Sequence, residues 1–190
     1  MKNTLLLVAF STLIWCLFAF SYSPPKNKAQ MASKNVAWMT WEEAISAANR
    51  AKKAGKVPKM IFVDIFTDWC GWCKKMDKET FEQTEVAAYL NKHFYPVKFN
   101  AEQKESINYA GKLFKYVVNG RRGYHELAAA LLNGKMSYPT VVFLNEDFQL
   151  LQRIPGYLDI PTFNSIMRYL AEKHYLDTPW AEYQETFNSK

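Results

Sequence analysis

The chain has 190 residues, a length that suits one globular domain with attachments at its ends. Hydrophobic residues make up 49% and aromatic residues 16% of the sequence, enough to build a core without many disulfides. The net charge of +6 comes from basic residues scattered among acidic ones. A nucleic-acid surface concentrates basic residues on one face, so we expect a solvated surface and no nucleic-acid partner.

The N-terminus has one basic residue followed by an apolar run over residues 5–20. This pattern is typical of a secretory signal peptide or a short membrane anchor, which we place at residues 1–21. The run is shorter than the ~20 residues of a usual spanning helix, which favours cleavage. Bulky, apolar neighbours argue against a lipid on Cys16. Cleavage leaves Cys70 and Cys73 as the only cysteines of an exported protein.

Residues 22–35 are rich in Pro, Lys, Asn and Gln, which indicates a solvated linker. We place a folded domain at residues 36–176 and a C-terminal tail at residues 177–190. The domain opens with a helix, because Thr40 and Glu43 have the spacing of a capping box ahead of an amphipathic stripe.

An almost uninterrupted apolar run at residues 60–66 predicts a central strand that is covered on both faces. A helical stretch follows the two cysteines and runs toward Lys92. The remaining elements that we expect are strands at residues 95–99, 140–144 and 148–154, and helices at residues 103–118, 124–132 and 161–174. This order predicts a mixed sheet with helices on both faces.

Residues 69–74 are the most informative stretch, because their sequence W-C-G-W-C-K follows the central strand directly. Cys70 is expected at a helix N-terminus, where the backbone dipole and unpaired N–H groups stabilise a thiolate. Such thiols have pKa values of about 3.5–7.5 instead of about 8.5, so Cys70 can attack near neutral pH. Cys73 lies one turn later and can attack a mixed disulfide formed by Cys70. This is the chemistry of dithiol–disulfide exchange.

Two other interpretations of the cysteine pair are open. A structural zinc site needs four ligands, and the three histidines of the sequence have no paired spacing. A structural disulfide would be a weak crosslink, because its loop holds only two residues. We therefore expect no metal, and no cofactor other than a redox-active disulfide between Cys70 and Cys73.

Residues 63–74 resemble the active-site segment of the thioredoxin superfamily, including an acidic residue, Asp64, six positions before the first cysteine. A second match lies downstream, where Tyr138 and Pro139 precede an apolar strand as in the cis-proline loop of that family. Two matches in the correct order are more specific than either alone. The sequence of the cysteine motif, W-C-G-W-C-K, is most similar to that of exported bacterial thioredoxin-like proteins.

The resemblance implies a fold class. We expect an α/β protein with a thioredoxin-like mixed central sheet and helices on both faces. The segment from Lys98 to Pro139 is longer than its counterpart in a compact thioredoxin, so we expect an extra helix inserted before the cis-proline strand.

The resemblance also implies roles for a carboxylate and a lysine. Asp64 matches the buried acid that exchanges a proton with the resolving thiol, Cys73, and burial would raise its pKa toward neutrality. The alternative is an acid that points outward at a strand edge. Lys98 matches the lysine that neighbours this acid, and the alternative is a surface lysine.

The other implied site residues surround the sulfurs. Pro139 is expected to be cis and to lie against them, where a substrate strand can pair beside it, and a trans turn proline is the alternative. Tyr138 would touch the disulfide and tune the choice of substrate. Trp69 is expected to pack as a shield and Trp72 to be exposed to clients, unless both are ordinary core aromatics.

These observations predict an exported thiol–disulfide oxidoreductase, a reductase or isomerase of protein disulfides, in the periplasm or another extracytoplasmic space. Its partners would be protein clients with thiols or disulfides, and a membrane or thiol electron donor. Two other functions are open. One is a metal carrier in which both thiolates hold Cu(I), and the other is an interaction module without catalysis on the same fold. The direction of electron flow depends on how the folded protein stabilises the thiolate.

Overall fold

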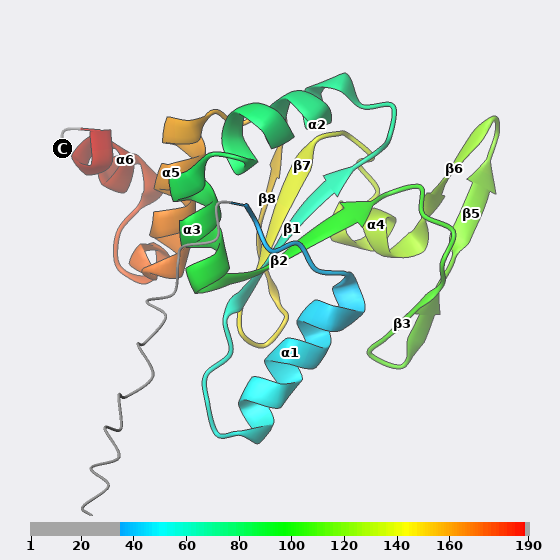
Figure 1. Ribbon diagram of the computed structural model, residues 1–190, viewed down its shortest axis with the longest axis horizontal. Helices are drawn as coiled ribbons and strands as arrows, with labels where there is room; N and C mark the ends of the chain where they lie inside the picture. The colour runs from blue at the N-terminus through cyan, green and yellow to red at the C-terminus, as the bar shows by residue number, and fades with distance from the viewer. Residues whose placement is uncertain (1–34, 189–190) are drawn as a thin grey trace, which may run out of the picture. The chain divides into compact units, whose positions relative to one another are not determined.

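A four-stranded sheet is the central feature of the computed structural model, which describes residues 35–188 (Figure 1). Strand β1 (Met60–Phe66) pairs in parallel with β2 (Phe94–Asn100) and antiparallel with β7 (Thr140–Leu144). On its other side, β7 pairs antiparallel with β8 (Leu150–Pro155). The sheet is therefore mixed, with strand order β2-β1-β7-β8, and the expected fold class is confirmed.

Alternate residues of β1 face two separate apolar cores, because successive side chains of a strand point to opposite faces. On one face Ile61 and Val63 pack with α1 (Trp41–Lys53) and α4 (Glu126–Leu131). On the opposite face Phe62 packs with the remaining helices around the sheet. These are α2 (Gly71–Met76), its π-helical continuation η1 (Asp77–Phe81), α3 (Thr84–His93) and α5 (Ile160–Ala171). Helices on both faces keep the central strand dry, as its sequence predicted.

The start of α1 has the expected capping box. The Thr40 hydroxyl accepts a hydrogen bond from the Glu43 N–H at 3.2 Å, and the Glu43 carboxylate accepts one from the Thr40 N–H at 2.8 Å. Two backbone donors that the helix leaves unpaired are thereby satisfied.

The segment between β2 and β7 differs from the prediction. The helix expected at residues 103–118 is wrong, because this part of the chain forms β structure. Two hairpins occupy it, in which β3 (Ile107–Tyr109) pairs with β4 (Lys112–Phe114) and β5 (Tyr116–Asn119) pairs with β6 (Arg122–His125). Only α4 remains of the two helices expected there. The insertion ahead of the cis-proline strand is therefore built from hairpins instead of an added helix.

Turn chemistry explains the hairpins. The first turn has Ala110 and Gly111 at its centre, both with positive φ, at 51° and 77°. The second turn has Gly120 at its first central position, with φ of 62°. Positive φ at these positions gives the turn a twist that matches two antiparallel strands, and it is incompatible with a continuing helix.

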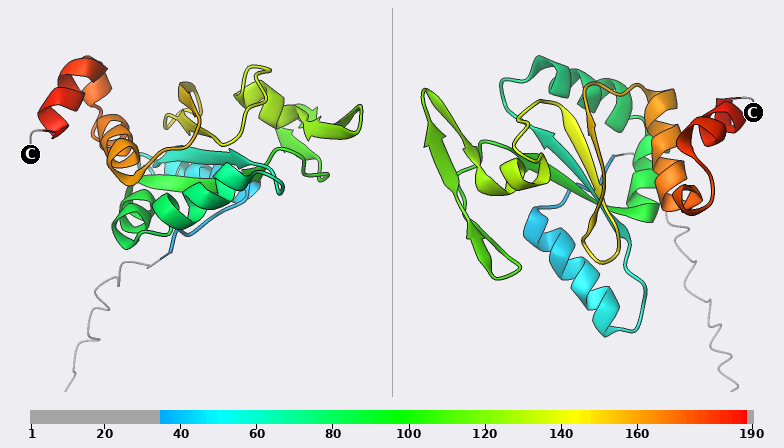
Figure 2. Two further views of the ribbon diagram at one scale, coloured as in Figure 1. Left: turned by 90° about the horizontal axis from the view of Figure 1, so that it is seen from above. Right: turned by 180° about the vertical axis from the view of Figure 1, so that it is seen from behind.

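The hairpins and the C-terminal helix lie on opposite sides of the sheet. Figure 2 shows β3 to β6 standing clear of the sheet on the side away from α5 and α6 (Trp180–Asn188). Tyr169 of α5 contacts the rings of Trp180 and Tyr183 at 5.1 and 5.0 Å between centroids. These aromatic contacts hold α6 on α5.

Some predictions concern residues that the structure does not describe. The signal peptide or anchor at residues 1–21, and the linker at residues 22–35 except for its last residue, lie outside the described part of the chain. The domain at residues 36–176 and the tail at residues 177–190 stay predictions as to their boundaries. Among residues 35–188 no helix combines the length and the apolar character that a membrane crossing requires.

Candidate active site

The two cysteines lie where β1 ends and α2 begins. A turn closed by a hydrogen bond of 3.0 Å from the Cys70 N–H to the Thr67 carbonyl reverses the chain. Cys70 is the N-cap of α2, and its sulfur is bonded to that of Cys73 at 2.03 Å. The Cys70 Sγ also accepts a hydrogen bond from the Cys73 N–H at 3.1 Å. Both side chains are nearly covered, with 5% of Cys70 and 2% of Cys73 exposed.

Two tryptophans flank the cysteine pair and remain open to solvent. Trp72 is 58% exposed, as expected, and lies beside Tyr157 at 5.7 Å between ring centroids. The Lys75 ammonium lies 4.9 Å from the centroid of the Trp72 ring. Trp69 is 50% exposed, so it covers the site less completely than the shield that we expected. Neither ring belongs to the core.

Trp69 connects the cysteine turn to the cis-proline loop. Its ring meets that of Tyr138 edge-on at 5.9 Å, and its indole N–H donates to Glu102 at 3.0 Å. Burial and the Glu102 charge raise the pKa of Tyr138 to about 12, so this phenol stays neutral at physiological pH. The Tyr138–Pro139 bond is cis, which confirms the expected geometry of the proline. Residues far apart in the sequence thus meet at one end of the sheet.

Asp64 is a fully buried carboxylate in the middle of β1, and the alternative of an outward-facing acid is wrong. Parallel pairing places it directly opposite Lys98 of β2. The Lys98 ammonium donates to Asp64 Oδ2 at 2.5 Å and also to Asp77 Oδ1. The lysine is therefore a neighbour of the buried acid, as predicted, and it joins two carboxylates.

The environment of Asp64 favours a protonated carboxyl more than water does. Burial raises the pKa of Asp64 to about 6, although the Lys98 charge and hydrogen bond lower it and the Asp77 charge adds a smaller rise. Its Oδ1 is buried with no hydrogen-bond partner among residues 35–188. A carboxyl group with this pKa exists in both protonation states near neutrality, so it can take up and release a proton.

The sequence interpretation missed Asp77. An acid on a helix after the cysteines is typical of a solvated surface, and nothing local distinguishes it. The available signal is spacing, because Asp77 lies four residues after Cys73 and so shares its helix face. The place of Asp77 in the site depends on its ion pair with Lys98, a contact between separate elements of the fold.

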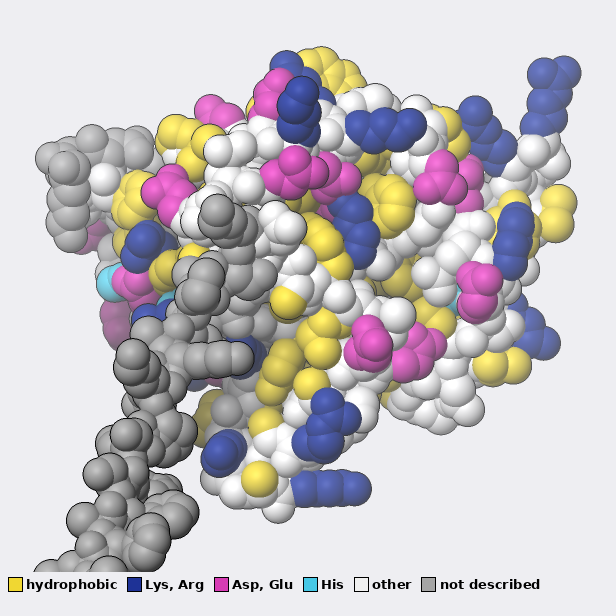
Figure 3. Space-filling view, viewed as in Figure 1, with side chains coloured by type: hydrophobic (Ala, Val, Ile, Leu, Met, Phe, Trp, Pro, Cys, Tyr) yellow, Lys and Arg dark blue, Asp and Glu magenta, His cyan; other side chains and the backbone are white. Residues whose placement is uncertain are grey.

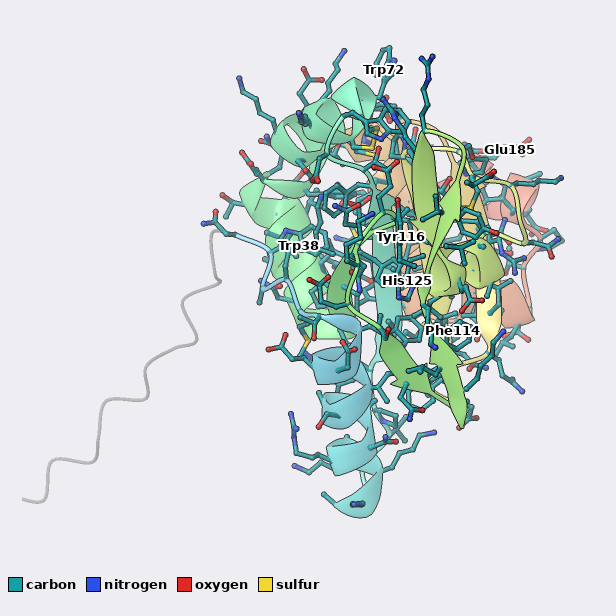
Figure 4. The ribbon with its side chains drawn as sticks, turned by 90° about the vertical axis from the view of Figure 1, so that its right-hand side faces the viewer. Trp38, Trp72, Phe114, Tyr116, His125 and Glu185 are labelled. Carbon is teal, nitrogen blue, oxygen red and sulfur yellow. A yellow bond between two sulfur atoms is a disulfide. The ribbon has the colours of Figure 1, made fainter. Side chains whose placement is uncertain are left out.

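The β5–β6 hairpin, which was expected to be part of a helical segment, brings Arg121 and Arg122 toward the site. The Arg122 guanidinium lies 4.2 Å from the centroid of the Trp69 ring. Figure 4 shows the hairpin in front, with its free end toward the end of the molecule where Trp72 is labelled. The hairpin therefore borders the cysteine site on the Trp69 side.

Comparison with known proteins agrees with this geometry. The model of the family Thioredox_DsbH, described as "Protein of unknown function, DUF255", matches residues 20–182. The chain is 29% identical over 96 residues to "Uncharacterized protein B0495.5" of Caenorhabditis elegans, which covers 50% of this chain and 12% of that protein. The chain spans about a tenth of the length of the curated relatives it matches.

Two solved structures show the same fold. A thioredoxin-fold protein from Helicobacter pylori superposes with a TM-score of 0.52 at 16% identity, over 69% of this chain and 81% of the other. A structure named DsbH Oxidoreductase superposes with a TM-score of 0.50 at 19% identity, over 74% of this chain and 88% of the other. The cysteine pair of this chain thus lies in a thioredoxin-like fold of the disulfide-oxidoreductase type.

Proposed function

Because the chain belongs to the Thioredox_DsbH family, we propose that it catalyses thiol–disulfide exchange on protein clients outside the cytoplasm, as a reductase or isomerase. The observation that carries the proposal is the hydrogen bond from the Cys73 N–H to the Cys70 sulfur at the start of α2. In the reduced protein the same N–H and the helix dipole favour a thiolate on Cys70 over a thiol.

In the first step of the proposed reaction, the Cys70 thiolate attacks a client disulfide. A new S–S bond forms between Cys70 and one client sulfur, while the old client S–S bond breaks. The second client sulfur leaves as a thiolate and takes a proton from solvent. Trp69 and Trp72, both half-exposed beside the cysteines, offer apolar surface to the client chain.

In the second step, Cys73 resolves the mixed disulfide. Its thiol loses a proton to the Asp64 carboxylate, and the resulting thiolate attacks the Cys70 sulfur. The client leaves with two thiols, and the protein keeps the Cys70–Cys73 disulfide. The pKa of about 6 for Asp64 supports this role, because the carboxylate is a sufficient base and can later pass the proton on. Lys98 and Asp77 would carry that proton toward solvent.

A complete cycle needs a source of two electrons. We propose a thiol or a membrane reductant that attacks the Cys70–Cys73 disulfide and restores the dithiol. In the isomerase mode no donor is consumed, because a client thiolate displaces Cys70 from the mixed disulfide. The signal-like residues 1–21 support a location outside the cytoplasm, where protein disulfides persist.

Reduction of insulin by dithiothreitol tests the proposed activity. The wild-type protein should accelerate the reduction, and the double variant Cys70→Ser with Cys73→Ser should not. The activity would be disproved if wild type and double variant gave the rate of dithiothreitol alone.

The reduction potential of the cysteine pair then separates the possible directions. A value near that of thioredoxin, about −270 mV, favours a reductase, whereas a value near −120 mV, as in strongly oxidising proteins, contradicts it. The measurement is an equilibrium titration of the Cys70–Cys73 disulfide with glutathione buffers.

A further inference from the structure

Basic residues without acidic ones characterise the segment from β4 to β6, residues 112–125, which we call the cationic arm. Four basic residues and no Asp or Glu occur in it. All four are exposed, and none forms an ion pair with another residue between 35 and 188: Lys112, Lys115, Arg121 and Arg122. In Figure 3 dark blue side chains stand along the edge of the molecule where the arm lies. Residues 50–59, at and beyond the end of α1, are a second run of basic residues without Asp or Glu, so the arm is one of two local concentrations of positive charge in the described part of the chain.

The free end of the arm is held by a ring packed on a glycine. A Cβ at Gly123 would overlap the Val117 carbonyl oxygen and the Tyr116 ring, so the ring lies where a side chain would otherwise stand. The Lys104 ammonium also lies over the Tyr116 ring, 3.0 Å from the ring centroid. These contacts fix the strands of the hairpin relative to the loop beneath them.

The base of the arm is held by a buried histidine. His125 Nδ1 accepts the Leu127 N–H at 3.2 Å, so Nε2 carries the proton and donates to the Glu105 carbonyl at 3.0 Å. The His125 N–H also donates to the Ala101 carbonyl at 2.7 Å. With its base and its strands both fixed, the arm presents its charges in a defined place instead of sampling many.

That place is beside the attacking cysteine. The Arg122 guanidinium lies over the ring of Trp69, the residue that precedes Cys70, and it forms no ion pair with a carboxylate among the described residues. A guanidinium on an aromatic face keeps its N–H edges free to bind carboxylates. On the opposite side of the cysteines, Lys75 is already 3.8 Å from Glu79, so its charge is compensated. Lys74, beside Cys73, is exposed and also forms no ion pair among residues 35–188, and Arg122 of the arm adds an unpaired positive charge on the Trp69 side of the cysteines.

We propose that the cationic arm binds acidic segments of client proteins and so selects clients whose reactive cysteine lies near several carboxylates. The inference rests on the proposed function and names its class of substrate. Glu102, held by the Trp69 indole N–H, keeps negative charge close to the cysteines. The carboxylates of the client therefore lie over the arm, a few residues from the client cysteine, and not directly at it.

The test compares two disulfide-bonded peptides of equal length, one with Glu and Asp flanking its cysteines and one with Gln and Asn in their place. Surface charge pairs contribute modestly each, so two or more should give wild type about a tenfold higher kcat/KM for the acidic peptide. Arg121→Gln with Arg122→Gln should reduce the ratio to about twofold or less. Because the charges are exposed, the wild-type ratio should also approach one in about 1 M salt, where the Debye length is about 3 Å.

A matched control has the same loss of charge elsewhere. Lys53→Gln with Lys56→Gln removes two exposed basic residues at the end of α1 and just beyond it, outside the arm, and should leave the ratio at its wild-type value. Equal kcat/KM for the two peptides with wild type, or an equal fall of the ratio in the control, would overturn the assignment of the arm.

A binding measurement keeps this inference separate from the proposed reaction. Fluorescence polarisation of a labelled acidic peptide with Ser in place of Cys reports binding without any disulfide chemistry. We expect its Kd to rise about tenfold in Arg121→Gln with Arg122→Gln and to stay constant in Lys53→Gln with Lys56→Gln. If wild type bound this peptide but reduced neither insulin nor the peptides, the reaction would fail and the arm would stand. If wild type reduced insulin but did not bind the acidic peptide selectively, the proposed reaction would stand and the assignment of the arm would fail.

Discussion

In β1 every residue from Met60 to Ile65 is buried, whereas in β5 and β6 only His125 is. The first strand is held by apolar cores on both of its faces, so its conformation follows from burial. Strands β5 and β6 are instead held by their hairpin turn, by the Tyr116 ring packed on Gly123 and by the buried His125. The sheet therefore supplies most of the stability and positions the cysteines, while the arm can change its exposed residues at little cost to the fold.

The largest effect should come from removing the nucleophile at the end of the sheet. Cys70→Ser should lower insulin reduction by at least about a thousandfold, because the remaining thiol, Cys73, is only 2% exposed and does not occupy the N-cap of α2. Cys73→Ser should instead accumulate mixed disulfides through Cys70, which mass spectrometry under non-reducing conditions detects. Trapping that required Cys73 would reverse the roles of the two cysteines.

The contrast in stability can be measured with one truncation in each region. Phe62→Ala should reduce the free energy of unfolding by about 3–5 kcal/mol, because it removes a fully buried ring between two elements of the core. Val118→Ala in the arm, where the side chain is 75% exposed, should change it by less than about 0.5 kcal/mol. Urea unfolding of both variants decides the comparison, and similar losses would contradict it.

Asp64→Asn should distinguish the role of this residue in the reaction from its role in the folded sheet. The amide keeps the shape of the carboxylate but cannot accept the proton that Cys73 must lose. We expect resolution of the mixed disulfide to slow by about 10- to 100-fold and its formation to change much less. Stopped-flow measurement of both half-reactions tests this expectation, and equal resolution rates in variant and wild type would exclude the proton transfer.

Gly123→Ala should act on the arm alone. The new Cβ would displace the Tyr116 ring, and we expect the amides of β5 and β6 to lose about 1–2 kcal/mol of protection in hydrogen exchange. Gly55→Ala is the control, because Gly55 has a positive φ of 69° but lies outside the arm. Loss of protection throughout the sheet in Gly123→Ala would show that the arm is part of the same cooperative unit.

The smallest expected effects are on the pH dependence of stability, where His125 and Asp64 should act with opposite signs. Burial lowers the pKa of His125 below 6.5, so its contribution to stability is complete above that pH and is lost as the pH falls. Burial raises the pKa of Asp64 to about 6, so its contribution is complete below pH 3.8 and is lost as the pH rises through about 6. Urea midpoints from pH 4 to 8 for wild type, His125→Asn and Asp64→Asn check both signs. The Asn at 125 can still cap α4, so an unchanged acid slope in that variant would contradict the first assignment.

Much of the site could be predicted because its signals are local. Cys70 and Cys73 are two residues apart, Asp64 stands out as the one charge in an apolar strand, and Pro139 precedes a second apolar run. Each of these patterns fits within about ten residues. The catalytic roles assigned to these residues stay proposals.

The hairpins could not be predicted by periodicity, because strands of three or four residues are too short to show an alternation. The helix expected at residues 103–118 ran across Ala110-Gly111, and Asn119-Gly120 was interpreted as part of a break between two helices, although this pair is also a typical hairpin turn. Contacts such as Arg122 with Trp69 join distant parts of the sequence, and no local pattern indicates them.

His125 is the last residue of β6 and also the N-cap of α4, so no linker separates strand from helix. Leu127 and Leu132 beyond it pack in the same core as Val142 of the strand that follows Pro139. The arm is thus joined to α4 without a flexible linker. A force that a bound client exerts on Arg122 would be transmitted to α4 and, through α4, to the strand beside the cysteines.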